Sequence, residues 1–156
     1  MWTIHRPRNL QMQFARHART LAVALALPLA ACAETTGLEE YAGRQNCSLR
    51  LIAINESIPG NLTTADCVMN DGSGAHVDYY ELRIFTTTYV DIYMESTTMD
   101  PYLVLLDEDD TVIDEDDDSL GGFDSWIQVK LTPGTYYIAA TSFTAAETGA
   151  YIVTVE

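Results

Sequence analysis

The sequence predicts an all-β fold, a single antiparallel β-sandwich of about eight strands. Short runs in which apolar and polar residues alternate recur from Ser48 onward, each bounded by Gly, Pro, Asp, Asn or Thr. No stretch after residue 40 carries a helical apolar face. With 156 residues, 47% of them hydrophobic, the chain can bury the core of one ordinary domain.

The expected strands follow one another at short spacing. They are 49–54, 78–86, 89–95, 102–106, 111–114, 125–131, 135–141 and 150–155. In the third strand, Val90, Ile92 and Met94 alternate with polar or aromatic residues, so we expect these three to face the core. Residues 132–134, Thr-Pro-Gly, have the chemistry of a turn.

Residues 1–31 are predicted to be a secretory signal peptide. The first 20 carry positive charge and no acid, and residues 21–31 are an unbroken apolar run ending in small residues. Residues 29–32, Leu-Ala-Ala-Cys, resemble the lipobox of bacterial lipoproteins, which implies that Cys32 becomes the lipid-bearing first residue. The alternative is ordinary cleavage at Ala31-Cys32-Ala33, which would release a periplasmic or secreted protein.

Residues 32–46 are polar and aperiodic and are predicted to be a flexible tether before a folded domain at 47–156. After removal of the leader, four basic residues face 23 acids, a formal charge of −19. Such a charge repels nucleic acid, so we expect no nucleic-acid partner. We expect a monomer held in the cell envelope by the lipid on Cys32, at the outer membrane if the cell is Gram-negative.

Cysteine usage fits an exported protein. Either route of leader removal takes Cys32 out of the thiol inventory and leaves the pair Cys47 and Cys67. Because the exported compartment is oxidising, we expect these two to form a disulfide.

Several motifs of the domain occur in a characteristic order. They are Gly60-Asn61-Leu62 with Asp66, Asp78-Tyr79-Tyr80, Asp100-Pro101-Tyr102-Leu103-Val104-Leu105, Asp116-Asp117-Asp118, Ser125, Pro133-Gly134-Thr135-Tyr136-Tyr137-Ile138 and Gly149-Ala150-Tyr151. Together they closely resemble the bacterial pre-peptidase C-terminal domain over residues 47–156. The resemblance implies a jelly-roll-like, non-catalytic sandwich, usually attached to secreted peptidases, with roles in secretion, substrate contact or calcium-dependent stability. No peptidase precedes the domain here, so we expect a freestanding copy.

Nine of the twelve residues from 107 to 118 are acids. Calcium takes six to eight oxygen ligands and is the natural ion for such a region. We expect residues 107–110 to form the tip of a hairpin, which separates them from the acids after the next strand. The preferred calcium set is therefore Asp100, Asp116, Asp117, Asp118 and Asp124. The alternative is a solvated acidic face that keeps the protein soluble without an ion.

The sequence carries no catalytic signature, and we expect no enzyme. His76 is the single histidine after the leader, so a base beside a nucleophile is not indicated. Alternation turns Tyr89, Tyr93 and Trp126 away from the predicted core, which makes them candidates for ligand contact.

These features predict an accessory or binding module that contacts a protein or a polysaccharide. A structural surface lipoprotein without a specific ligand and a cryptic hydrolase are the alternatives. Exposure of the three rings favours binding, their burial favours the structural role, and paired carboxylates in a pocket favour the hydrolase.

Overall fold

The computed structural model describes Arg44, residues 47–145 and residues 147–156, and the regular structure of the last two ranges is entirely β. The predicted leader, 1–31, and the predicted tether, 32–46, lie outside these residues except for Arg44. None of the described residues forms a helix of the length and apolarity that crossing a bilayer requires.

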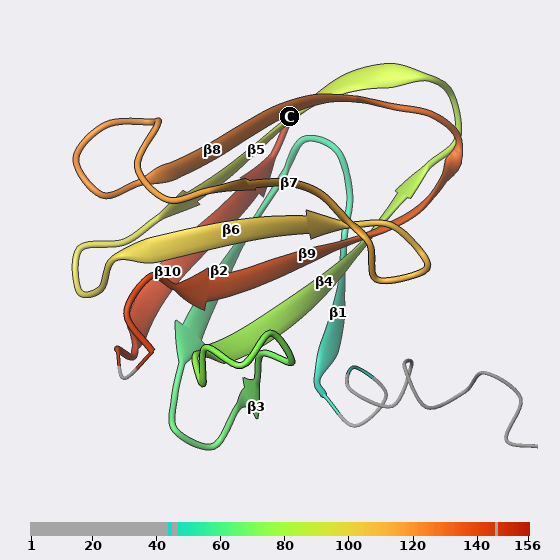
Figure 1. Cartoon of the computed structure of the whole chain (residues 1–156). Coiled ribbons are helices and arrows are strands. Elements are labelled where there is room, and N and C mark those ends of the chain that lie inside the picture. Colours follow the sequence, from blue (N-terminus) through green and yellow to red (C-terminus); the bar gives the residue numbers. More distant parts are fainter. Residues whose placement is uncertain (1–43, 45–46, 146) are drawn as a thin grey trace, which may run out of the picture. The chain divides into compact units, whose positions relative to one another are not determined.

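Ten strands build the domain (Figure 1). They are β1 (Leu49–Ile52), β2 (Glu56–Leu62), β3 (Cys67–Val68), β4 (His76–Ile84), β5 (Thr88–Glu95), β6 (Pro101–Leu106), β7 (Val112–Asp116), β8 (Ser125–Leu131), β9 (Gly134–Ser142) and β10 (Gly149–Val155). The eight predicted strands are all present. The two missed ones are β2 and β3.

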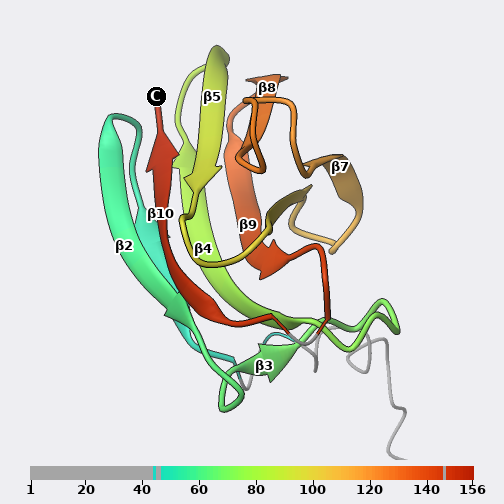
Figure 2. The same ribbon diagram turned by 90° about the vertical axis from the view of Figure 1, so that its left-hand side faces the viewer.

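The strands form two sheets that face each other (Figure 2). The larger sheet has the order β1-β4-β9-β6-β7, with β3 also paired to β4. The smaller sheet has the order β2-β10-β5-β8. All pairs are antiparallel except β1 with β4, which is parallel. The predicted β-sandwich is therefore confirmed, with one parallel pair at its edge.

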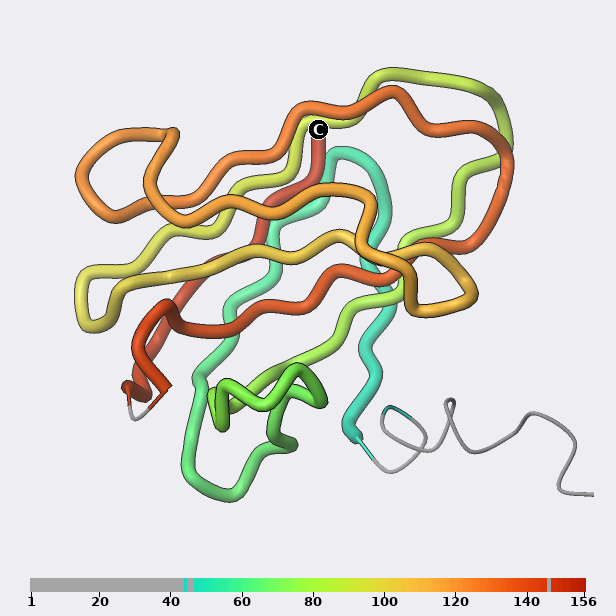
Figure 3. The backbone as a smooth tube through the Cα atoms, in the orientation of Figure 1, coloured from blue at the N-terminus to red at the C-terminus, as the bar shows by residue number. Residues whose placement is uncertain are grey.

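Two connections carry the chain between the sheets side by side (Figure 3). In the larger sheet, the β4–β9 ladder ends where Ile84 faces Gly134, and in the smaller sheet the β5–β8 ladder begins where Thr88 faces Leu131. The segments 84–88 and 131–134 thus run together from one sheet to the other. This paired crossing gives the fold its jelly-roll-like character.

The core lies between the inner faces of the two sheets. Val90, Ile92 and Met94 of β5 are fully buried, as their alternation predicted. From the larger sheet, Tyr80, Leu82 and other residues of β4, β6 and β9 fill the opposite side. The outer face of the smaller sheet carries polar and aromatic side chains on β5 and β8, and the exposed Ile152 on β10.

Strand β2 was missed because its sequence contains Pro59 and Gly60, which usually mark turns. In the structure β2 pairs only with β10 and forms an edge of the smaller sheet. Proline is tolerated in an edge strand because its missing N–H is not needed on the open side.

A network of side-chain hydrogen bonds links β4 and β10 across the sandwich. Tyr151 donates to Oδ2 of Asp78 at 2.6 Å, and its hydroxyl lies 2.8 Å from that of Tyr80. Arg50 Nη1 donates to the Tyr80 hydroxyl at 3.2 Å and to the carbonyl of Pro59 at 3.0 Å. Buried polar groups need hydrogen-bond partners. This network provides them, and so avoids the loss of stability that burial of unpaired groups would cause.

Candidate functional site

Three aromatic side chains lie on the outer face of the smaller sheet, and we call Tyr89, Tyr93 and Trp126 the aromatic face. Tyr93 of β5 and Trp126 of β8 are directly paired in register. Their rings are parallel, with 7° between the planes and 6.4 Å between the centroids. Tyr89 is 66% exposed, and the Lys130 ammonium lies 5.6 Å from its ring centroid.

Asp91 anchors the Trp126 indole of the aromatic face. Its Oδ1 accepts hydrogen bonds from Nε1 of Trp126 at 3.0 Å and from Nε2 of Gln128 at 2.9 Å. Its main chain is fixed in turn by two hydrogen bonds with Glu156, of 3.0 and 2.8 Å. The pKa of Tyr93 is raised by burial, and then by the charges of Asp91 and Glu156. The sequence did not single out Asp91, although alternation puts it on the same face, midway between the two tyrosines.

The predicted calcium ligands lie at one end of the β6–β7 hairpin, as the antiparallel register requires. Asp100 precedes β6, and Asp116 ends β7 opposite Leu103. The pKa of Asp100 is raised by burial and by the negative charges of Glu147, Asp117 and Asp118. Several acids therefore share one electrostatic environment.

Two of the predicted ligands are already occupied by main-chain amides. Oδ2 of Asp116 accepts from the amides of Trp126 at 2.8 Å and Ser119 at 3.1 Å, and Oδ1 of Asp124 accepts from Ser96 at 3.0 Å. Across the described ranges, no three or more His, Cys, Asp or Glu side chains are grouped so as to hold a metal ion. These carboxylates act here as caps of turns and strand ends, and calcium binding stays a prediction.

The other acids form the opposite end of the same hairpin. Oδ1 of Asp107 accepts from the amides of Asp109 at 2.9 Å and Thr111 at 2.8 Å, while Asp110 adopts a φ of 63°. This is a turn built around one carboxylate. The predicted separation of residues 107–110 from Asp116 by the length of a strand is confirmed.

The disulfide between Cys47 and Cys67 is confirmed, with their Cα atoms 5.6 Å apart. Both cysteines pack against a small apolar cluster on the outer face of the larger sheet, which includes Tyr79, Val104 and Ala139. The bridge therefore ties the start of the domain to the outside of this sheet.

His76 is the histidine within the described residues, and it begins β4. Its Nδ1 lies 3.3 Å from the carbonyl oxygen of Asp66, and its own carbonyl accepts a hydrogen bond from the Thr141 hydroxyl at 2.6 Å. These contacts connect the histidine to the main chain and to a strand neighbour. They are structural contacts of a strand end.

The sequence also missed a pocket on the outer face of the larger sheet. Its volume is about 530 Å³, and it lies over Tyr79 of β4 and over Tyr102 and Val104 of β6. A signal was present, since β6 reads PYLVLL, apolar at both odd and even positions. Such a run indicates a strand that is buried on both faces. Here the outer face of β6 is only partly covered, which leaves the pocket.

Comparisons with known proteins agree with this architecture. No family model matches the sequence, and no curated protein matches it. The pre-peptidase C-terminal domain of a collagenase from Bacillus anthracis superposes with a TM-score of 0.55 and 20% identity, over 70% of this chain and 95% of that one. The described domain thus has the pre-peptidase C-terminal domain fold, as its motifs predicted.

A second group of solved structures is less similar. PliG of Aeromonas hydrophila, a periplasmic lysozyme inhibitor of g-type lysozyme, matches with a TM-score of 0.45 and 12% identity, over 70% of this chain and 100% of that one. The corresponding inhibitor from Salmonella Typhimurium has a TM-score of 0.40, also at 12% identity, over 69% of this chain and 98% of that one.

Proposed function

We propose that this protein is an exported, non-catalytic binding module of the bacterial cell envelope, and that its aromatic face contacts a polysaccharide. The observation that carries the proposal is the exposure of this face. Tyr89 is 66% exposed, and Tyr93 and Trp126 are only half-buried on an outer sheet surface. A cluster of aromatic rings that reaches the surface of one sheet is more typical of a contact surface than of a purely structural protein.

The chemistry of the face favours a sugar polymer. Sugar rings have apolar faces that pack on aromatic rings, and hydroxyl groups that need hydrogen-bonding partners. Parallel rings of Tyr93 and Trp126 offer the first, and the tyrosine hydroxyls, Gln128 and Lys130 offer the second. Because Asp91 fixes the indole in advance, little conformational entropy is lost on binding.

The absence of catalysis is part of the proposal. The single histidine of the described residues is engaged with the main chain, which supports a binding role rather than nucleophilic chemistry. Export rests on the predicted leader, and attachment to the envelope rests on lipidation of Cys32. A protein partner on the same face is the alternative.

Affinity electrophoresis through gels that contain envelope or plant polysaccharides tests the proposal. We expect retardation of the protein by at least one polymer, and loss of most of it in Tyr93→Ala and Trp126→Ala, since each substitution removes a ring on which a sugar would pack. Phe85→Ala is the matched control, because Phe85 is 84% exposed in the turn after β4. Equal retardation of all variants would contradict the role of the aromatic face.

A pull-down from envelope extracts, with and without calcium, separates the alternatives. Capture of one protein that Trp126→Ala abolishes, without retardation in any gel, would replace the polysaccharide by a protein ligand. No enrichment in either assay would favour the structural role.

A further inference from the structure

The pocket of the larger sheet lies on the opposite side of the sandwich from the aromatic face. Its floor is the outer face of β4 and β6, where Tyr79, Tyr102, Val104 and Leu106 point outward. Ala139 of β9 is paired in register with Tyr79 on one side and Val104 on the other. Its small side chain leaves space above this part of the sheet. The volume of about 530 Å³ falls within the range of small-ligand sites.

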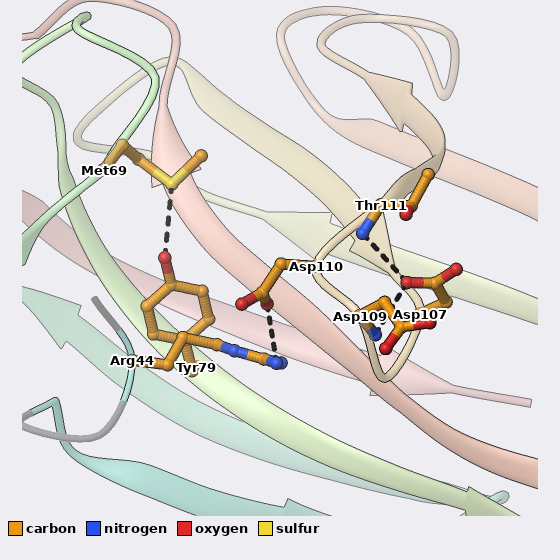
Figure 4. Close-up of polar contacts among 7 residues, drawn as sticks. All are labelled: Arg44, Met69, Tyr79, Asp107, Asp109, Asp110 and Thr111. Atoms are coloured by element: carbon orange, nitrogen blue, oxygen red, sulfur yellow. Dashed lines mark hydrogen bonds and ion pairs between the residues drawn. The ribbon is translucent and has the colours of Figure 1, made fainter. Parts of the chain in front are cut away.

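Two walls rise from this floor. One is formed by Met69, Asn70 and Asp71 after β3, and the other by the β6–β7 hairpin. The Tyr79 hydroxyl contacts the sulfur of Met69 at 3.8 Å, which joins the first wall to the floor (Figure 4). The Cys47–Cys67 disulfide packs against the same apolar cluster as Met69 of this wall.

The rim of the pocket is acidic. Four carboxylates line it, those of Asp71, Asp109, Asp110 and Glu115, and Arg44, which is paired with Asp110, lines the pocket as well. The pKa of Tyr102 is raised to about 12 by burial, by a hydrogen bond to Glu115 and by the charges of Glu115, Asp117 and Asp71. The pKa of Asp71 is lowered by its hydrogen bonds with Ser73, so this carboxylate is negative at neutral pH. The floor of the pocket is therefore aromatic, and its potential is negative.

The chain's own Arg44 shows how a cation is bound on this face. Its guanidinium carbon lies 3.4 Å from the ring centroid of Tyr137, and Nη2 lies 2.6 Å from Oδ1 of Asp110. Figure 4 shows this pair beside Tyr79. Arg44 is 9% exposed. A guanidinium here combines an aromatic ring with a carboxylate, the geometry that arginine favours over lysine.

We propose that this pocket binds an arginine side chain from a basic segment of a partner protein. The aliphatic part of the side chain packs on Val104 and Leu106, and the guanidinium lies against the Tyr102 ring between Asp71 and Glu115. This arrangement repeats, one strand further along the sheet, what Arg44 does with Tyr137 and Asp110. Anionic ligands are repelled by the rim, and a purely apolar ligand would remove water from the carboxylates without bringing a cation to replace it.

Titration calorimetry with the protein purified from cells that export it tests the proposal. The probe is the capped peptide acetyl-Gly-Arg-Gly-Arg-Gly-amide, compared with its lysine counterpart and with N-acetyl-arginine amide. We expect the arginine peptide to bind tightest. Glu115→Gln and Asp71→Asn should each raise its Kd about tenfold, because each removes a hydrogen bond between charged groups. Glu95→Gln, on the smaller sheet, removes the same charge and should change Kd less than about twofold.

Amide NMR spectra provide a readout independent of affinity. Shifts on peptide addition should concentrate at Tyr79, Tyr102 and Val104. Equal weakening by Glu95→Gln, or shifts spread over the whole acidic surface, would show nonspecific attraction and overturn the proposal. Equal binding of the lysine peptide would overturn guanidinium recognition, and equal binding of the single amino acid derivative would overturn the protein partner. Failure of polysaccharide binding leaves this test unaffected, since the two surfaces are on opposite sheets.

Discussion

The ring of Tyr151 lies directly over Gly60 on the neighbouring strand. The two residues are paired in the β2–β10 register, and a Cβ placed at Gly60 would be 2.1 Å from Cζ of the ring and 2.3 Å from its oxygen. No larger residue fits without moving the ring. The same ring carries the hydroxyl that is hydrogen-bonded to Asp78. A glycine at position 60 is therefore required for this hydrogen-bond network to form.

Gly60→Ala should therefore destabilise the domain by about 1–3 kcal/mol, the usual cost of overpacking a core. Urea unfolding measures the change. Gly134→Ala is the matched control, since a Cβ there would meet the Tyr136 ring at an ordinary distance of 3.5 Å. If the two variants lose equal stability, the close approach of Tyr151 is not the cause.

The carboxylate of Asp78 should make stability depend on pH in an unusual direction. Burial raises its pKa, more than the Tyr151 hydrogen bond lowers it. A group with a raised folded pKa contributes stability fully below its unfolded pKa and loses it as pH rises through the folded value. Asp78→Asn should thus gain stability relative to the parent as the pH rises above the ordinary pKa of 3.8.

For Asp71→Asn, the change in stability relative to the parent should depend on pH in the opposite direction. The pKa of Asp71 is lowered, chiefly by its hydrogen bond with the Ser73 side chain, so its contribution is present above the unfolded pKa and lost as pH falls. Guanidinium unfolding at several pH values measures both variants. The same trend in both would refute these assignments.

Loss of the disulfide should cost on the order of 3 kcal/mol, because it closes a loop across a sequence separation of 20 residues. Cys67→Ser should lower the melting temperature accordingly. Cys32→Ser, before the predicted domain at 47–156, should leave it unchanged. A Cys67→Ser variant as stable as its parent would mean that the bridge constrains the unfolded chain very little.

Calcium and magnesium should raise the melting temperature equally at equal ionic strength. Both relieve repulsion around Asp100, Asp117 and Asp118, whereas Asp116 and Asp124 are already hydrogen-bonded to amides. Thermal melts with each ion and with chelator measure this. A larger shift with calcium, lost in Asp117→Asn, would instead support the specific site predicted from the sequence.

Lipidation of Cys32 is tested by labelling cells with radioactive palmitate. We expect label in the parent and none in Cys32→Ser, with the parent in the membrane fraction. An unlabelled, soluble parent would favour the ordinary signal-peptidase route.

Most strands could be predicted because their period-two patterns reflect burial on a single face. In β5 and β8, that rule also placed Tyr93 and Trp126 on one outer surface. Strand β2 was hidden because Pro59 and Gly60 mimic a turn, and Gly60 is required by a ring 91 residues later in the sequence, Tyr151. The pocket was missed because its floor and walls come from three separate segments of the chain. Their approach depends on sheet order, which residue spacing does not specify.

The segment closed by the Cys47–Cys67 bridge supplies an edge to each sheet. Strands β1 and β3 are hydrogen-bonded to β4, and strand β2 is hydrogen-bonded to one edge of β10. If this segment detached, both β4 and β10 would expose a row of unpaired amides and carbonyls to a second copy of the chain. The Cys47–Cys67 bond therefore helps to keep both of these sheet edges covered.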